Sequence, residues 1–170
     1  PLLFAGDLSH DKGVQVLLDA YTQLNCPPPL LLAGRSHESW NFPPGARWLG
    51  EVPHATVVEL FHSARAVVVP SVWSDPCPTV VLEAMAGGRP VVAAASGGIV
   101  DMVLDGRTGF LVPPGESAAL AAALAALLDK PELAEEFGVA GRDRARDFTV
   151  SAVVPRVEAM YADAVRRGGR

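Results

Sequence analysis

Residues 70–98, with the sequence PSVWSDPCPTVVLEAMAGGRPVVAAASGG, contain the pattern that decides the fold class of this chain. An apolar run ends at Pro70, a polar turn contains Asp75, and a helix over residues 79–86 ends at two glycines before Pro90 opens another apolar run. This order of strand, turn, helix and strand is typical of a β/α unit in a parallel sheet. In such sheets the turn after a strand lies at the carboxyl edge, where ligands bind.

The same alternation extends along most of the sequence. Short apolar runs predict strands at residues 2–5, 30–33, 47–49, 66–70, 90–94 and 109–112, and helical patterns occupy residues 13–24, 55–64, 79–86 and 99–104. Strands that are short and almost continuously apolar are typical of a sheet covered on both faces. We therefore predict an α/β fold with a single doubly wound, Rossmann-like parallel sheet.

The C-terminal third of the chain is predicted to be helical. Helices are expected over residues 116–130, 131–148 and 151–167, with Ser151 capping the last one. Pro155 predicts either a start of that helix near its own position or a kink there. Residues 168–170 are expected to fray.

Composition limits the classes of protein to which the chain can belong. Its 170 residues fit one domain, and 49% hydrophobic with 19% charged residues predict an ordered globular core. The net charge of −5 argues against a nucleic-acid surface, and no apolar run is long enough to span a membrane. Because the sequence starts inside an apolar run without Met, we interpret it as a piece of a longer protein. Cys26 and Cys77 lack metal-ligand spacing and are predicted to be free thiols, although the sequence leaves a disulfide open.

The first strand-to-helix turn, FAGDLSHDKGVQVLL at residues 4–18, predicts an anion site. Gly6 ends the strand, and Lys12 with Gly13 opens the helix, so backbone N–H groups, the helix dipole and one cation would face a ligand. The alternative is a solvated turn with an ordinary lysine. Neither a G-x-G-x-x-G nor a P-loop pattern is present here.

Two further segments add polar groups at the same predicted edge. Glu83 lies among apolar residues of its helix, where a carboxylate needs a hydrogen-bonding partner such as a sugar hydroxyl, a backbone group or an arginine. Residues 96–98, Ser-Gly-Gly, form a turn that is a weaker candidate for a second cradle of N–H groups.

Taken in order, these motifs resemble family-4 retaining glycosyltransferases. The resemblance rests on KGV-x-x-LL-x-A from Lys12, on PS at residues 70–71, and on Asp75 followed after seven residues by EAMA-x-G-x-PVVA from Glu83. It continues through GG at residues 97–98 and DG-x-TGFLV from Asp105 to DFTVSAVVPRVEAMY near the C-terminus. The resemblance implies the C-terminal, nucleotide-sugar-binding half of a GT-B fold, with residues 1–148 as the donor-nucleotide domain and 149–170 as a crossover helix.

The resemblance also implies roles for particular residues. Lys12 would grip the donor diphosphate, Asp75 would contact hydroxyls of the donor sugar, and Glu83 would contact the ribose; these three are the predicted catalytic residues. The wider predicted site comprises Gly6, Asp7, Gly13 and the backbone amides of Thr79 and Val80 for the nucleotide, and Pro76, Cys77 and Pro78 for the sugar.

Three positions depart from the family's pattern. Asp75 replaces the usual glutamate, Pro78 replaces a glycine and has no N–H, and Asp7 stands where arginine commonly provides a second cation. A carboxylate at residue 7 would repel the diphosphate or turn outward as a loop cap. Arg35 either supplies the missing cation or is a solvated surface residue, and the sequence favours the second interpretation.

The implied reaction is transfer of a sugar from a nucleoside-diphosphate donor with retention of configuration, without a cofactor or metal. The acceptor would bind a missing N-terminal domain, so the isolated chain is expected to bind without turnover. The apolar stripe Val153, Val157, Met160, Tyr161 and Ala164 would contact that domain, or else cover this domain's own sheet.

The resemblance also implies a cytoplasmic protein, with peripheral association of the full-length protein at the inner face of the membrane left open. Alternatives are a nucleotide-sugar epimerase or a phosphorylase of the same fold, or a degenerate nucleotide-binding or scaffolding module. The sequence does not specify the base, the sugar or the acceptor.

Overall fold

The six strands of the computed structural model, which describes residues 1–168, form one parallel sheet in the order β3-β2-β1-β4-β5-β6. They are β1 (Leu2–Ala5), β2 (Leu30–Ala33), β3 (Ala46–Gly50), β4 (Ala66–Val69), β5 (Val91–Ala94) and β6 (Gly109–Val112). Strand order reverses between β1 and β4, which makes this pair the switch point of a doubly wound sheet.

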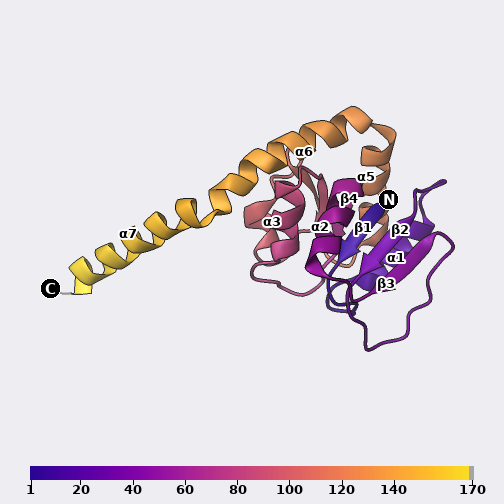
Figure 1. Cartoon of the computed structure of the whole chain (residues 1–170), viewed down its shortest axis with the longest axis horizontal. Helices are drawn as coiled ribbons and strands as arrows, with labels where there is room; N and C mark the ends of the chain where they lie inside the picture. The colour runs from indigo at the N-terminus through magenta and orange to yellow at the C-terminus, as the bar shows by residue number, and fades with distance from the viewer. Residues whose placement is uncertain (169–170) are drawn as a thin grey trace.

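Helices cover both faces of the sheet, as predicted for its apolar strands (Figure 1). They are α1 (Val14–Thr22), α2 (His54–Ser63), α3 (Thr79–Ala86), α4 (Ile99–Met102), α5 (Ser117–Asp129), α6 (Pro131–Ala145) and α7 (Val150–Gly168), with a 3-10 turn, η1 (Arg146–Phe148). Side chains alternate along β1, so Leu2 and Phe4 pack with α1 and α5, whereas Leu3 packs with α2, α3 and α4. The predicted fold class is confirmed.

Element boundaries differ from the predicted ones for identifiable reasons. Pro70 and Pro90 fall outside β4 and β5 because proline has no N–H for the ladder, although the Pro90 carbonyl still accepts from Val67 N at 3.0 Å. Helix α4 ends at Met102, two residues early, and the Thr108 hydroxyl accepts from Leu104 N at 2.9 Å just beyond it.

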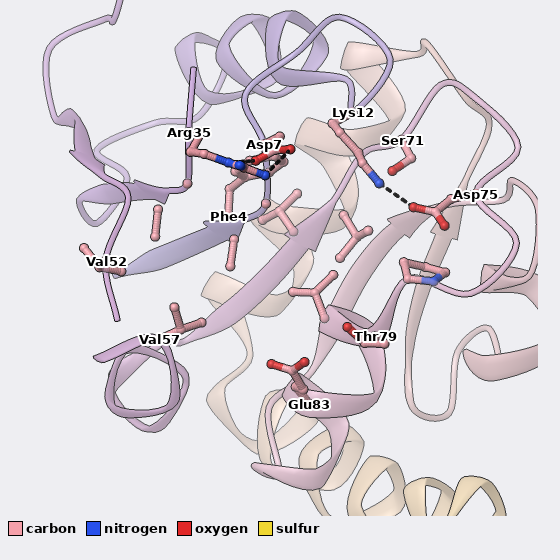
Figure 2. Close-up of a pocket in the computed structure, with 18 of the residues that line it drawn as sticks. Phe4, Asp7, Lys12, Arg35, Val52, Val57, Ser71, Asp75, Thr79 and Glu83 are labelled. Atoms are coloured by element: carbon pink, nitrogen blue, oxygen red, sulfur yellow. Dashed lines mark hydrogen bonds and ion pairs between the residues drawn. The ribbon is translucent and has the colours of Figure 1, made fainter. Parts of the chain in front are cut away.

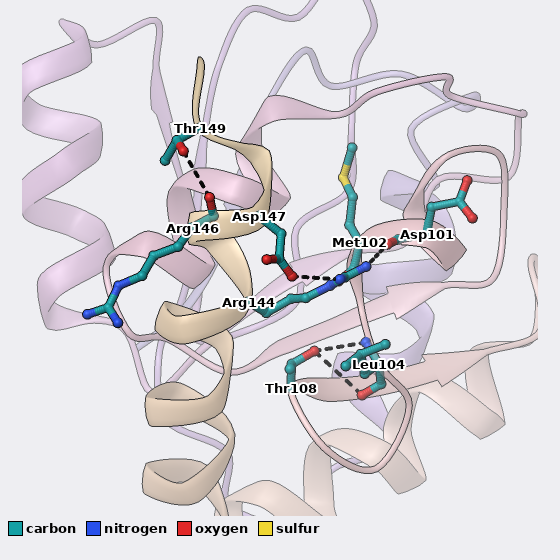
Figure 3. A network of polar contacts seen from close by, with 8 residues as sticks. All are labelled: Asp101, Met102, Leu104, Thr108, Arg144, Arg146, Asp147 and Thr149. Carbon is teal, nitrogen blue, oxygen red and sulfur yellow. Dashed lines mark hydrogen bonds and ion pairs between the residues drawn. The ribbon is translucent and has the colours of Figure 1, made fainter. Parts of the chain in front are cut away.

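A polar network centred on Arg144 fastens the end of α6 to the body of the domain (Figure 3). Its guanidinium donates to the carbonyl of Asp101 at 2.6 Å and pairs with Asp147 at 2.8 Å. The same group lies 4.9 Å from the centre of the Phe148 ring. Because Arg144 joins α6, α4 and η1, it fixes the point from which α7 departs.

Helix α7 extends away from the sheet and its covering helices (Figure 1). It begins at Val150, so the predicted cap at Ser151 and a start at Pro155 were both wrong. Pro155 lies inside the helix near its beginning and removes the hydrogen bond to the Ser151 carbonyl. The helix tolerates this loss because Ser151 is exposed to solvent. Of the expected fraying segment, residues 169 and 170 lie outside the described part of the chain.

The predicted apolar stripe of α7 does not cover this domain's own sheet. Its members Val153 and Val157 are 37% and 39% exposed, and Met160 and Tyr161 are 63% and 66% exposed. Side chains of this size are usually buried, so the helix presents an apolar face without a partner in residues 1–168.

Candidate functional site

A cavity of about 530 Å³ opens at the carboxyl edge of the sheet, at the switch point between β1 and β4 (Figure 2). Its polar lining comes from the turn after β1, the ends of β2 and β3, and the turn and helix after β4. The lining includes Gly6, Asp7, Lys12, Arg35, Glu51, Ser71, Asp75, Cys77, Pro78, Thr79, Val80 and Glu83. Ligands of doubly wound sheets bind at this position.

Two glycines allow the backbone segments around the cavity to come close together. Gly13, with φ of 72°, lies where a Cβ would be 1.9 Å from the Pro70 carbonyl oxygen, so α1 begins directly beside the end of β4. Gly34 has a φ of 147°, and a Cβ added to it would be 1.8 Å from the Gly6 carbonyl oxygen. Any other residue at these positions would push the turns apart.

Lys12 and Asp75 form an ion pair at one end of the cavity, with Nζ 2.5 Å from Oδ2 (Figure 2). The Lys12 side chain is 32% exposed and that of Asp75 10% exposed. Lys12, which is predicted to bind the diphosphate, and Asp75, which is predicted to bind the sugar, therefore neutralise each other in the absence of a donor. A donor that engages both must share or open this pair.

The turn that carries Asp75 is held by three hydrogen bonds to other backbone segments. Gly98 N donates to the Asp75 carbonyl at 2.8 Å, Ser96 Oγ donates to the Trp73 carbonyl at 2.5 Å, and Val72 N donates to the Asp11 carbonyl at 2.9 Å. A Cβ at Gly97 would lie 2.1 Å from the Asp75 carbonyl oxygen. Residues 96–98 therefore support the Asp75 turn, and they are not among the residues that line the cavity.

The N-terminus of α3 faces the cavity through Thr79 and Val80. As the first two helical residues they have no helical acceptor for their N–H groups, whereas Val81 N donates to the Pro78 carbonyl at 3.0 Å. Pro78 itself lies just before the helix, where a missing N–H costs no helical bond. This helix end can thus offer two donors and its dipole to an anion.

Glu83 lies one turn further along α3 and also lines the cavity. Its Oε2 is 3.3 Å from Nε2 of His54, the first residue of α2, and its side chain is 35% exposed. The sequence left the partner of Glu83 open between a ligand, a backbone group and an arginine. The structure supplies an exposed histidine, which leaves the carboxylate accessible to a ligand.

Asp7 forms an ion pair with Arg35 at the other end of the cavity, at 3.3 and 3.4 Å. Both side chains are 58% exposed. The hydrogen bonds to Asp7, its charge and that of Glu51 raise the pKa of Arg35. Asp7 is thus neither an outward loop cap nor an isolated repelling charge, because its carboxylate holds an arginine at the cavity wall.

The cavity as a whole carries more negative than positive charge. The four carboxylates Asp7, Glu51, Asp75 and Glu83 face two cations, Lys12 and Arg35, which leaves a formal charge of −2. Backbone N–H groups at the turn after β1 and at the start of α3 are therefore important for any anion that binds here.

Most of the predicted site residues lie together, with two exceptions. Gly13 and Pro76 are not among the lining residues, because Gly13 packs on Pro70 and the Pro76 carbonyl packs against Gly98. The sequence interpretation missed Ser71, Glu51, Val52, Val57 and the neighbouring His54. Glu51 and Val52 follow β3 directly, so their position after a predicted strand was the signal that could have found them.

Comparisons with known proteins assign the family. A model described as "Glycosyl transferases group 1" matches residues 1–130. The chain is 33% identical over 182 residues to a glycogen synthase of Mycobacterium tuberculosis, covering 99% of this chain and 44% of that protein. It is 34% identical over 179 residues to a phosphatidyl-myo-inositol mannosyltransferase of Mycobacterium leprae, covering 99% of this chain and 48% of that protein.

Solved structures give the same result. Sucrose-phosphate synthase from Thermosynechococcus elongatus matches with a TM-score of 0.84 and 29% identity, over 98% of this chain and 46% of the other. Anabaena HepE in complex with UDP and glucose matches with a TM-score of 0.79 and 25% identity, over 94% of this chain and 48% of the other.

The chain belongs to the group 1 glycosyltransferases and has the fold of the C-terminal, Rossmann-like half of a GT-B enzyme. It spans about half the length of the curated relatives it matches.

Other expectations concern thiols and the membrane. Cys26 and Cys77 are both free and exposed, which confirms the prediction of two thiols. Across residues 1–168, no helix combines the length and the apolar character that crossing a bilayer requires.

Proposed function

We propose that this chain binds the nucleoside-diphosphate part of a sugar donor in the cavity at the β1/β4 switch point. The observation that carries the proposal is that Lys12, from the turn after β1, meets the N-terminus and Glu83 of α3, from after β4, at one cavity. Its volume of about 530 Å³ falls within the range of small-molecule sites.

Each part of the donor has a matching chemical group in the cavity. The diphosphate lies between the turn after β1 and the start of α3, where Lys12 and the amides of Thr79 and Val80 donate hydrogen bonds. Glu83 accepts from the ribose hydroxyls, and Asp75 accepts from hydroxyls of the sugar. The segment with Glu51 and Val52, at the end of β3, borders the remaining space for the base.

The full-length protein then transfers the sugar to an acceptor with retention of configuration and without a metal. In this reaction the leaving diphosphate gains negative charge, which fixed N–H groups and one cation can stabilise without reorganisation. Lys12 is the cation placed for this task, provided that donor binding draws it away from Asp75. Among residues 1–168 there is no group of three His, Cys, Asp or Glu side chains that could hold a metal ion.

Acceptor binding belongs to a second domain, so the isolated chain binds the donor without turning it over. Support comes from the length of the relatives, of which this chain covers 44% to 48%. The exposed apolar face of α7 supports the same proposal, because it offers a surface that a neighbouring domain would cover.

One observation favours a second candidate, a nucleotide-binding module without transferase activity. Both cations of the cavity are already paired with carboxylates, and the formal charge of the lining is −2. Such a site would bind a diphosphate weakly. A measurable rate of sugar transfer by the full-length protein would exclude this candidate.

Calorimetry of the 170-residue chain with UDP, GDP and ADP tests the proposed site. Glu83→Ala is expected to weaken binding of the preferred nucleotide by roughly 1–3 kcal/mol, the scale for losing a charged hydrogen bond. Glu59→Ala is the matched control, because Glu59 is an exposed glutamate of α2 outside the cavity lining. Equal affinities of the Glu83 variant and the control would contradict the assignment, and loss of affinity in EDTA would contradict metal-independent binding.

A further inference from the structure

A second cavity of about 530 Å³ lies at the opposite edge of the sheet from the proposed donor site. Arg65 directly precedes β4 and Arg89 lies two residues before β5, so both stand at the amino ends of neighbouring parallel strands. Arg142 reaches the same cavity from α6. The three arginines face a single carboxylate in the lining, Glu135, which leaves a formal charge of +2 in a chain whose net charge is −5.

Two close contacts at Gly88 bring Arg142 to this place. Gly138 of α6 lies where a Cβ would be 2.3 Å from the Gly88 carbonyl oxygen, so the helix rests directly on the turn after α3. One turn later along α6, the Arg142 guanidinium lies so close to Gly88 that a Cβ added to Gly88 would be 2.3 Å from Nη2 of Arg142. Arg142 is therefore held against the residue that precedes Arg89.

The hydrogen-bonding capacity of these arginines is largely unused. None of the three forms an ion pair among residues 1–168. Arg89 donates from Nη1 to the Ala64 carbonyl at 3.4 Å, while its Nε is buried without a hydrogen-bond partner. Within the described residues, Nε of Arg89 is the one buried side-chain nitrogen or oxygen atom in this condition. Buried polar groups are normally paired, so this unpaired donor adds to the unused hydrogen-bonding capacity beside the cavity.

We propose that this cavity, which we call the arginine cavity, binds the phosphate group of a small phosphorylated molecule. Planar guanidinium groups match phosphate oxygens with paired N–H donors, and a formal charge of +2 balances a phosphate dianion. The cavity is larger than one phosphate ion needs and falls in the size range of small-molecule sites, so the phosphate carries a further group. The site is separate from the donor cavity because the two share no lining residue.

Titration of the ¹⁵N-labelled chain with inorganic phosphate, replacing chloride at constant ionic strength, tests the proposal by residue. We expect amide shifts at Gly88, Arg89 and Gly138, with an affinity distinct from that of any shifts at the donor turn. Acetate at the same ionic strength provides a monoanion control and is expected to leave the Gly88 amide unchanged. Saturable shifts at these amides with pyrophosphate would support the same site.

Substitutions of the two exposed arginines, Arg65 and Arg142, assign the binding groups without disturbing the half-buried Arg89. Arg142→Gln and Arg65→Gln are each expected to weaken phosphate binding at the Gly88 amide roughly tenfold, the scale of one hydrogen bond to a charged group. Arg47 is an exposed arginine on edge strand β3 that forms no ion pair among residues 1–168. Arg47→Gln removes the same charge and should change this affinity less than about twofold. Shifts confined to residues 6–13, or equal effects of all three substitutions, would overturn the proposal.

Discussion

The ion pair between Lys12 and Asp75 makes a prediction that separates a binding role from a structural one. If Lys12 binds the diphosphate while Asp75 competes for it, the two substitutions change nucleotide affinity in opposite directions. Lys12→Met should weaken binding of a nucleoside diphosphate, and Asp75→Asn should tighten it. If the pair only holds the turn after β4 in place, both substitutions should weaken binding.

The magnitudes follow from the exposure of the two groups. Losing a hydrogen bond from a cation to phosphate costs roughly 1.5–3 kcal/mol, so Lys12→Met should reduce affinity at least about tenfold. Asp75 pairs with Lys12 at the wall of a cavity that is open to water. Removing its charge is worth about 1 kcal/mol, the interaction of two charges at short range in a high dielectric, and should raise affinity roughly fivefold.

Stability gives an independent measure of the same pair. Lys12→Met leaves the Asp75 side chain, which is only 10% exposed, without its cation, and should lower the free energy of unfolding by about 1–3 kcal/mol. The upper part of that range is reduced because Lys12 itself is one third exposed. Asp75→Asn should cost less, because a neutral amide can still accept from Lys12.

Calorimetry at two salt concentrations and urea unfolding, with wild type and both variants, measure these effects. The nucleoside diphosphate without sugar is the decisive ligand, because Asp75→Asn also removes an acceptor for sugar hydroxyls. The complete sugar nucleotide should therefore gain less affinity than the diphosphate in this variant. Weaker diphosphate binding by the Asp75 variant, at unchanged stability, would refute the competition between the two charges.

Three further predictions concern other parts of the molecule. Asp7→Arg should tighten nucleoside-diphosphate binding, more strongly at low salt, which calorimetry measures. The unfolding midpoint in urea should change little, because the ion pair of Asp7 with Arg35 is exposed. Gly138→Ala should destabilise the chain by about 1–3 kcal/mol in urea unfolding, because its Cβ would overlap the Gly88 carbonyl. The control Gly141→Ala, whose Cβ would be 3.6 Å from its nearest neighbour, should leave the stability unchanged or raise it by up to about 1 kcal/mol. Equal effects of the two substitutions would be inconsistent with this packing. Amides of residues 153–164 in α7 should exchange more slowly in the full-length protein than in this chain, and equal protection would exclude an interdomain role for the helix.

The sequence predicted the fold class well because the signals that it used are local. Apolar runs mark strands that are buried on both faces, and three of the six predicted strands have the observed bounds. The errors at Pro70 and Pro90 arose from treating apolar character as strand structure, although proline cannot donate to a ladder. The start of α7 at Val150 was missed because Ser151 was taken as the cap and Pro155 as a signal for a start or a kink. Solvent can satisfy the carbonyl that a proline frees on an exposed helix.

The candidate site was predictable in its location but not in its pairing. Motifs after two strands indicated which residues lie at the carboxyl edge, because parallel strands all end there. The ion pairs join residues that are 63 positions apart for Lys12 and Asp75, and 28 apart for Asp7 and Arg35. Whether such residues touch depends on the strand order and on close contacts such as that of Gly13 with Pro70, which no local pattern specifies.

The Asp7–Arg35 pair shows how two neighbouring strands can share one electrostatic function. The sequence interpretation treated Asp7 and Arg35 separately, one as a lost cation and the other as a surface residue. Strands β1 and β2 are adjacent and in register, so the residues that follow their terminal glycines face each other at the cavity wall. A cation is thus present at this wall, supplied from β2 rather than β1, and a carboxylate limits its freedom. Because the pair is exposed on both sides, a diphosphate can compete with Asp7 for the guanidinium at low cost. With aspartate at residue 7, the cation at this wall is Arg35, which follows β2, and the Asp7 carboxylate balances its charge.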